Sequence, residues 1–208
     1  MNTAKKPERV YTYADYLTWP EEESWELIEG VPYDMSPAPG IKHQSISSNL
    51  HGAIWNYLKG KPCKVFAAPI DVIFPHNHRE KDENVTTVVQ PDIIVVCDSS
   101  KLTPTHCKGA PDLIIEILSP STASKDMKQK RDLYEKNGVK EYWIVDPSNM
   151  TVQIYELINE QYGKPDTYGA TDMIQVGIFE DLKINMTEVF EVEIAEEVES
   201  GFPFFDLP

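Results

Sequence analysis

Two short apolar segments, each carrying one carboxylate, constrain the fold more than any other feature of this chain. Residues 93–96 read Ile-Ile-Val-Val, and residues 113–118 read Leu-Ile-Ile-Glu-Ile-Leu. Segments that are apolar on both faces predict central strands of a sheet that is covered on both sides. Asp92 precedes the first segment and Glu116 lies within the second. Because an unpaired carboxylate in a dry interior costs several kcal/mol, Glu116 must meet a cation, hydrogen-bond donors or an open cleft.

The periodicity of the remaining chain predicts a mixed sheet flanked by helices. Apolar positions recur at helical spacing in residues 41–59, and a second helix is predicted over residues 124–136, where Asn137-Gly138 ends it. Strands are predicted in residues 25–35 (a hairpin around Gly30), 64–74, 85–96, 111–118 and 141–157, with residues 101–110 as a connection. This order indicates an α/β or α+β domain with an N-terminal β-hairpin. We assign residues 1–11 to a tail, 12–190 to the domain and 191–208 to an acidic C-terminal tail.

The composition of the chain indicates the cellular compartment to expect. No segment approaches the roughly 20 apolar residues that span a bilayer, so we expect no membrane partner. The first ten residues lack the apolar stretch of a secretory signal. Cys63, Cys97 and Cys107 are odd in number and widely spaced, which predicts neither a disulfide framework nor a zinc site. We therefore expect a reduced, cytoplasmic protein.

The charge of the chain is strongly negative but uneven. A net charge of −15 argues against a nucleic-acid partner, because phosphate binding requires a positive surface. Residues 172–208 contain ten acidic side chains and one lysine, whereas residues 123–140 contain six basic and three acidic side chains. The second segment is the one place where this sequence predicts a locally positive surface.

Lys130 is placed unusually within the second predicted helix. When successive residues advance by about 100°, Lys130 falls within the apolar arc that contains Leu133 and Tyr134, whereas Lys125 and Lys128 point outward. A lysine on the buried face of a helix is uncommon. Its ammonium group either extends to solvent along the protein surface or reaches the carboxylates of Asp92 and Glu116.

The two carboxylates allow more than one interpretation. Glu116 and Asp92 could form structural ion pairs at strand positions. Alternatively, their oxygen atoms suit Mg²⁺ or Mn²⁺, with water and substrate phosphate completing the coordination. In that case Lys130 would stabilise a developing negative charge or orient the attacking water.

Several motifs resemble one known family. They are Pro91-Asp92, Glu-Ile-Leu-Ser-Pro-Ser-Thr at 116–122, Asp126, Lys130, Tyr134 and Gly-Val-Lys-Glu-Tyr-Trp-Ile-Val-Asp-Pro at 138–147, together with Glu-Leu-Ile-Glu-Gly at 26–30 and the helix of His43. Over residues 12–190 the chain resembles the Uma-two family of restriction endonucleases, which belongs to the PD-(D/E)XK nuclease superfamily. The resemblance implies a restriction-endonuclease-like fold, with Asp92 and Glu116 as metal-binding catalytic carboxylates.

The resemblance also reveals one departure from the superfamily motif. The lysine expected two residues after Glu116 is Leu118 in this chain. The resemblance and the helical geometry both point to Lys130 as its replacement.

Other candidates have weaker signals. Glu26 is a candidate for a supporting carboxylate from an N-terminal element, and His43 fits either a core position or a substrate role. Asp71 could join the acidic cluster or lie at a sheet edge. Asp112 is four residues from Glu116, roughly 13 Å along a strand, and is assigned to a strand start. Ser119 lacks a Ser-His-Asp context and is assigned to a turn.

These features predict a metal-dependent endonuclease that hydrolyses DNA rather than RNA and acts as a homodimer. A non-catalytic binding or scaffold relative is the alternative, because Leu118 stands in place of the motif lysine and the surface is acidic. A hydrolase of smaller phosphoesters is a third possibility.

Overall fold

The computed structural model describes residues 9–20, 23–35, 39–119 and 126–193 and has a mixed α+β architecture. Most of the two predicted tails lies outside the described residues, as do Lys125 and the expected start of the second helix. The larger sheet has the strand order β11-β10-β9-β8-β6-β3, and β12 also pairs with β10. Its strands are β3 (Lys64–Ala67), β6 (Ile93–Val96), β8 (Leu113–Ile117), β9 (Glu141–Asp146), β10 (Thr151–Ile158), β11 (Gln161–Tyr162) and β12 (Asp166–Tyr168).

The two carboxylate-bearing segments lie side by side at the centre of this sheet. β6 pairs antiparallel with β8, and β8 pairs parallel with β9. Every residue of β6 and β8 is buried, which confirms the prediction of central strands. Burial on both faces explains why neither strand alternates apolar with polar residues.

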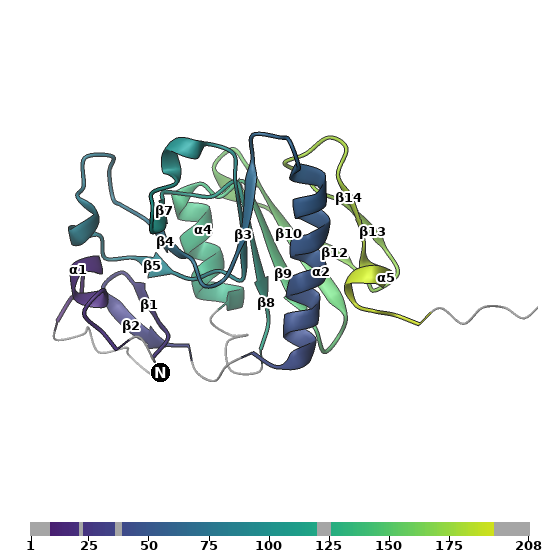
Figure 1. Cartoon of the computed structure of the whole chain (residues 1–208), viewed down its shortest axis with the longest axis horizontal. Helices are drawn as coiled ribbons and strands as arrows, with labels where there is room; N and C mark the ends of the chain where they lie inside the picture. The colour runs from purple at the N-terminus through teal and green to yellow at the C-terminus, as the bar shows by residue number, and fades with distance from the viewer. Residues whose placement is uncertain (1–8, 21–22, 36–38, 120–125, 194–208) are drawn as a thin grey trace, which may run out of the picture.

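Helices cover both faces of the larger sheet (Figure 1). Helix α2 (Ile41–Leu58) packs against the face that includes Ile93 and Ile115. Helix α4 (Arg131–Asn137) packs against the opposite face, which includes Ile94 and Ile114. A π-helical turn, Asp126–Lys130, leads directly into α4, and Gly138 ends it in the left-handed conformation.

A second sheet carries the N-terminal hairpin. Its strand order is β2-β1-β5-β4-β7. The strands are β1 (Trp25–Ile28), β2 (Val31–Asp34), β4 (Asp71–Ile73), β5 (Val88–Val89) and β7 (His106–Lys108). The expected hairpin is therefore present. Strand β7 pairs parallel with β4, so the prediction of residues 101–110 as a plain connection is wrong.

Three smaller elements complete the described chain. Helix α1 (Tyr13–Tyr16) is capped by Thr12. Strands β13 (Met173–Gln175) and β14 (Lys183–Asn185) form a separate antiparallel pair, and α5 (Met186–Val189) follows them. Within the described ranges, no helix combines the length and the apolar character that a membrane crossing requires.

A disulfide joins Cys63 to Cys97, which contradicts the prediction that the cysteines form none. Cys63 directly precedes β3 and Cys97 directly follows β6, and the neighbouring residues Lys64 and Val96 pair across these strands. Long-range strand pairing therefore brings the two cysteines together, which their spacing does not reveal. The argument for a reducing compartment rested on the absence of a disulfide and loses its basis. Cys107 is free and buried.

Asp112 stabilises the start of β8. Its side chain is 7% exposed and accepts hydrogen bonds from Cys97 N (2.7 Å) and Lys140 Nζ (2.7 Å). These contacts connect the end of β6 to the starts of β8 and β9. The interpretation of Asp112 as a strand-start residue is therefore confirmed.

We predict that Asp112→Ala lowers the free energy of unfolding by about 1–3 kcal/mol, because it leaves the partly buried Cys97 amide without its acceptor. Urea denaturation followed by circular dichroism measures the change. Asp166→Ala, which removes an exposed carboxylate from β12, is the matched control and should differ little from the parent protein. Equal stability of the two variants would contradict this role of Asp112.

Candidate active site

Lys130 lies at the centre of a buried cluster of charges. Its side chain is 3% exposed, and its Nζ is 2.8 Å from Glu26 Oε1 and 2.9 Å from Glu116 Oε1. The prediction that Lys130 occupies the buried helix face is confirmed, and the alternative that it extends to solvent is wrong. The cluster joins strand β1, strand β8 and the turn before α4, which are far apart in the sequence.

The backbone at Lys130 departs from the regular helix on which its prediction was based. Lys130 is the last residue of the π-helical turn, and α4 begins at Arg131. Such turns occur as single interruptions of α-helices, frequently at functional sites. Lys130 nevertheless shares a buried face with Leu133 and Tyr134 of α4.

Tyr134 adds a hydroxyl donor to this cluster. Its Oη donates to Glu116 Oε1 at 2.6 Å, so this carboxylate oxygen accepts from both an ammonium and a phenol. Burial, followed by the nearby charge of Glu116, raises the pKa of Tyr134 well above its usual value. The phenol therefore stays protonated and remains a donor at neutral pH.

Glu26 has a more direct part in the cluster than its sequence signal indicates. Glu26 is fully buried on β1. Its Oε1 atom contacts Lys130 Nζ and also accepts a hydrogen bond from Gln90 N at 3.1 Å. The sequence marks Glu26 only as a supporting carboxylate. The structure places it in contact with the lysine, at a distance similar to that of Glu116.

Asp92 lies opposite Glu116 across two neighbouring strands. Ile93 of β6 pairs with Ile115 of β8 in an antiparallel register. The residue before Ile93, Asp92, therefore lies opposite the residue after Ile115, Glu116. Asp92 Oδ2 accepts from Ile117 N at 2.7 Å, which holds its carboxylate against β8. The side chain of Asp92 is 20% exposed and that of Glu116 is 5% exposed, so the cluster approaches solvent on the Asp92 side.

His43 reaches Asp92 from the other face of the sheet. Its Nε2 lies 3.3 Å from Asp92 Oδ2, and its side chain is 12% exposed. A pocket of about 180 Å³ lies beside this pair. It is lined by Pro39, His43, Gln44, Ser47, Ser48, His51, Ala67, Ala68 and Asp92. Apart from His43, the polar residues of α2 that line the pocket were not singled out in the sequence, although they recur at helical spacing beside its apolar positions.

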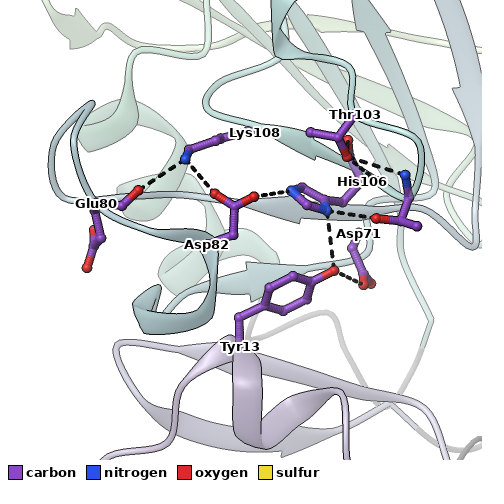
Figure 2. Close-up of polar contacts among 8 residues, drawn as sticks. Tyr13, Asp71, Glu80, Asp82, Thr103, His106 and Lys108 are labelled. Carbon is purple, nitrogen blue, oxygen red and sulfur yellow. Dashed lines mark hydrogen bonds and ion pairs between the residues drawn. The ribbon is translucent and has the colours of Figure 1, made fainter.

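Asp71 belongs to a different cluster. At the start of β4 it accepts from Tyr13 Oη at 3.3 Å (Figure 2). It also accepts from Tyr16 Oη (2.9 Å) and Gln90 Nε2 (2.9 Å). The described contacts therefore do not bring Asp71 to Lys130 directly. Gln90 links the two clusters, because its backbone amide binds Glu26 and its side chain binds Asp71.

Among the described side chains, the cluster holds more carboxylates than ammonium groups. Glu26, Glu116 and Asp92 supply three carboxylates, and Lys130 supplies one ammonium group. Among the residues with described side chains, no group of three or more His, Cys, Asp or Glu is arranged to hold a metal ion. An ion at Asp92 and Glu116 would thus depend on water and substrate oxygens for its other ligands. That donor set fits Mg²⁺, which commonly binds one or two carboxylates and phosphate oxygens.

The locally basic segment is largely paired in the structure. Arg131 pairs with Asp132, Lys136 with Glu29 and Lys140 with Asp112. The pairs of Arg131 and Lys136 are exposed, and such pairs contribute little stability. These two cations can therefore exchange their carboxylate partners for phosphate groups at little cost.

Comparisons with known proteins agree with this fold. The model of the Uma2 family, described as "Putative restriction endonuclease", matches residues 13–187. The uncharacterized protein slr1290 of Synechocystis sp. is 26% identical over 165 residues, which cover 78% of this chain and 82% of that protein. The crystal structure of a DUF820 protein from Anabaena variabilis, titled a putative nuclease, has a TM-score of 0.68 at 24% identity. The match covers 86% of this chain and 97% of the Anabaena chain.

We predict that Lys130→Met lowers the free energy of unfolding by about 3–5 kcal/mol at neutral pH, because two buried carboxylates lose their cation. Without the ammonium, the folded-state pKa of each carboxylate rises above its unfolded value near 4.3. The folded variant then binds more protons than the unfolded chain, so its stability falls as pH rises through this range. Denaturation at a series of pH values measures the effect.

Lys128→Met is the matched control, because Lys128 is an exposed lysine of the same π-helical turn. It should change stability by less than about 0.5 kcal/mol at every pH. If Lys130→Met behaves like Lys128→Met, the buried ion pairs do not hold in solution.

Proposed function

The chain belongs to the Uma2 family, and from this membership we propose that it is a metal-dependent endonuclease that hydrolyses DNA phosphodiester bonds. The observation that carries the proposal is the placement of Asp92 opposite Glu116, with buried Lys130 bound to Glu116. Two acidic residues on adjacent strands and one lysine are the chemical groups that metal-assisted phosphodiester hydrolysis uses.

In this proposal each residue has a distinct task. Asp92 and Glu116 would hold Mg²⁺ or Mn²⁺, which supplies Lewis-acid stabilisation of the phosphate and lowers the pKa of bound water. Lys130 would place its positive charge beside the charge that develops on the phosphate oxygens. Glu26 and Tyr134 would position Lys130 and Glu116 through the contacts described above.

The substrate would approach from the Asp92 side, where the cluster meets solvent and the polar face of α2 forms a pocket. Arg131 and Lys136 would offset part of the repulsion between DNA and a chain of net charge −15. Cleavage of both strands of a duplex requires two sites, so we further propose that the protein acts as a homodimer. We also propose that the protein is cytoplasmic, where DNA is available as a substrate. In that compartment the Cys63–Cys97 disulfide would be exposed to reducing conditions.

A non-catalytic role in nucleic-acid binding is the second candidate. Leu118 stands where the superfamily motif has its lysine, and the one lysine described in the cluster is held by two carboxylates. In that case the cluster would serve stability alone. Activity measurements separate the two candidates.

We predict that the purified protein cleaves DNA when Mg²⁺ or Mn²⁺ is added and does not do so in EDTA. Glu116→Gln and Asp92→Asn should abolish cleavage, because each removes one negative ligand charge, and Lys130→Met should slow it by about 100-fold or more. Gel assays on supercoiled plasmid measure the rates. Lys128→Met and Asp166→Asn are controls that should retain full activity.

Cleavage by Glu116→Gln at the parental rate would overturn the assignment of the site. Absence of cleavage with either metal, on duplex and single-stranded substrates alike, would favour the non-catalytic candidate.

A further inference from the structure

A second, larger cavity lies between the two sheets. Its volume is about 540 Å³, which falls within the range of roughly 300–1,000 Å³ typical of small-molecule sites. It is bounded by the edge strand β3 of the larger sheet, by β4 and by the loop that precedes β7. Its lining residues are Lys64, Phe66, Pro69, Ile70, Asp71, Gln90, Leu102, Thr103, Pro104, Thr105 and His106.

The polar lining of this cavity is firmly held. Asp71 accepts from two tyrosine hydroxyls and from the Gln90 amide, so neither Asp71 nor Gln90 is free to rotate. His106 is 7% exposed, its Nε2 lies 3.2 Å from Asp82 Oδ2, and its Nδ1 lies 3.5 Å from Tyr13 Oη, the hydroxyl that also binds Asp71 (Figure 2). Lys108 Nζ binds the second oxygen of Asp82 at 2.5 Å and so fixes it.

The loop before β7 is ordered by its own side chains. Thr103 Oγ1 donates to the carbonyl of His106 and accepts from His106 N, while Thr105 Oγ1 lies 3.1 Å from His106 Nδ1. The cavity is thus bounded by preorganised groups, and ordering them on ligand binding would cost little free energy.

The cavity adjoins the candidate active site. Residues 66–71 run between the two, with Ala67 and Ala68 lining the pocket beside Asp92 and Pro69, Ile70 and Asp71 lining this cavity. Gln90 forms a second link, since it lines the cavity and its backbone amide binds Glu26. A polymer whose phosphate lay at Asp92 could therefore place a neighbouring group in the cavity.

We propose that this cavity binds one unpaired base of a single-stranded or locally opened nucleic acid, an inference that rests on the proposed nuclease function. The mixture of lining groups suits a base, which needs apolar contact for its faces and fixed polar groups for its edge. Phe66, Ile70 and Leu102 supply apolar surface, and Asp71 and Gln90 supply the polar groups. The Asp71 carboxylate disfavours a phosphate in the same space.

Asp71 also determines which base is preferred. Oδ1 accepts from Tyr16 and Gln90, whereas Oδ2 accepts from Tyr13. A carboxylate has about four acceptor positions, so Asp71 can still accept one hydrogen bond. A base with an exocyclic amino group, such as cytosine, can donate it to this carboxylate. The donor on the corresponding edge of thymine is N3–H, which is flanked by two carbonyl oxygens that a carboxylate repels.

The test is the binding of labelled single-stranded oligo(dC) and oligo(dT) to the full chain in EDTA, measured by fluorescence anisotropy. The expected result is binding of oligo(dC) about tenfold tighter than that of oligo(dT), the effect of one hydrogen bond to a charged acceptor. Asp71→Asn should remove this preference. Pro104→Trp, which fills the cavity from an exposed loop position, should weaken binding of both by about tenfold or more.

Asp166→Asn and Met173→Trp are matched controls at exposed positions outside the cavity, and circular dichroism verifies the fold of every variant. Equal binding of the two oligonucleotides, or unchanged binding by a folded Pro104→Trp, would overturn the base pocket. Metal-dependent cleavage without base preference would leave the nuclease proposal intact and remove this one. Base preference without cleavage under any metal would support the pocket and contradict the nuclease.

Discussion

The contact of the Lys130 ammonium with Glu26 and Glu116 is the interaction on which the rest of the structure depends. It joins the N-terminal hairpin, the central strand β8 and the turn before α4. Burying these charges is costly, and the close geometry and the additional donors described at Glu116 and Glu26 compensate for it. The hairpin is therefore held to the larger sheet by electrostatics as well as by apolar packing.

This arrangement separates two chemical functions within one cluster. Glu116 receives a lysine and a tyrosine from the α4 side, while Asp92 receives a histidine from the α2 side and approaches solvent. The superfamily motif supplies its lysine from the same strand as the second carboxylate. In this chain Lys130, from the turn before α4, reaches Glu116, and Leu118 occupies the position two residues after Glu116.

The sequence predicts local features of this structure well. The central strands follow from their β-branched composition, and the buried position of Lys130 follows from the spacing of Leu133 and Tyr134. The hairpin at Gly30 is equally local, and the structure contains it.

Features that depend on distant pairing escaped prediction. Strand β7 is short and reads His-Cys-Lys, so only its pairing with β4 identifies it. The Cys63–Cys97 disulfide and the contact of Glu26 with Lys130 arise from strand pairing and helix packing across the chain. Asp71 carries the same chemical signal as Asp92, and only the tertiary structure shows that it belongs to a separate cluster.

The central claim is that Asp92 and Glu116 form a site for a divalent cation beside Lys130. Anomalous diffraction from crystals soaked in Mn²⁺ tests it most directly, because manganese is located without reference to activity. The account predicts one anomalous peak within ligand distance, about 2.0–2.3 Å, of both carboxylates. Absence of a peak at this position at millimolar Mn²⁺, or a peak bound only by other residues, would contradict it.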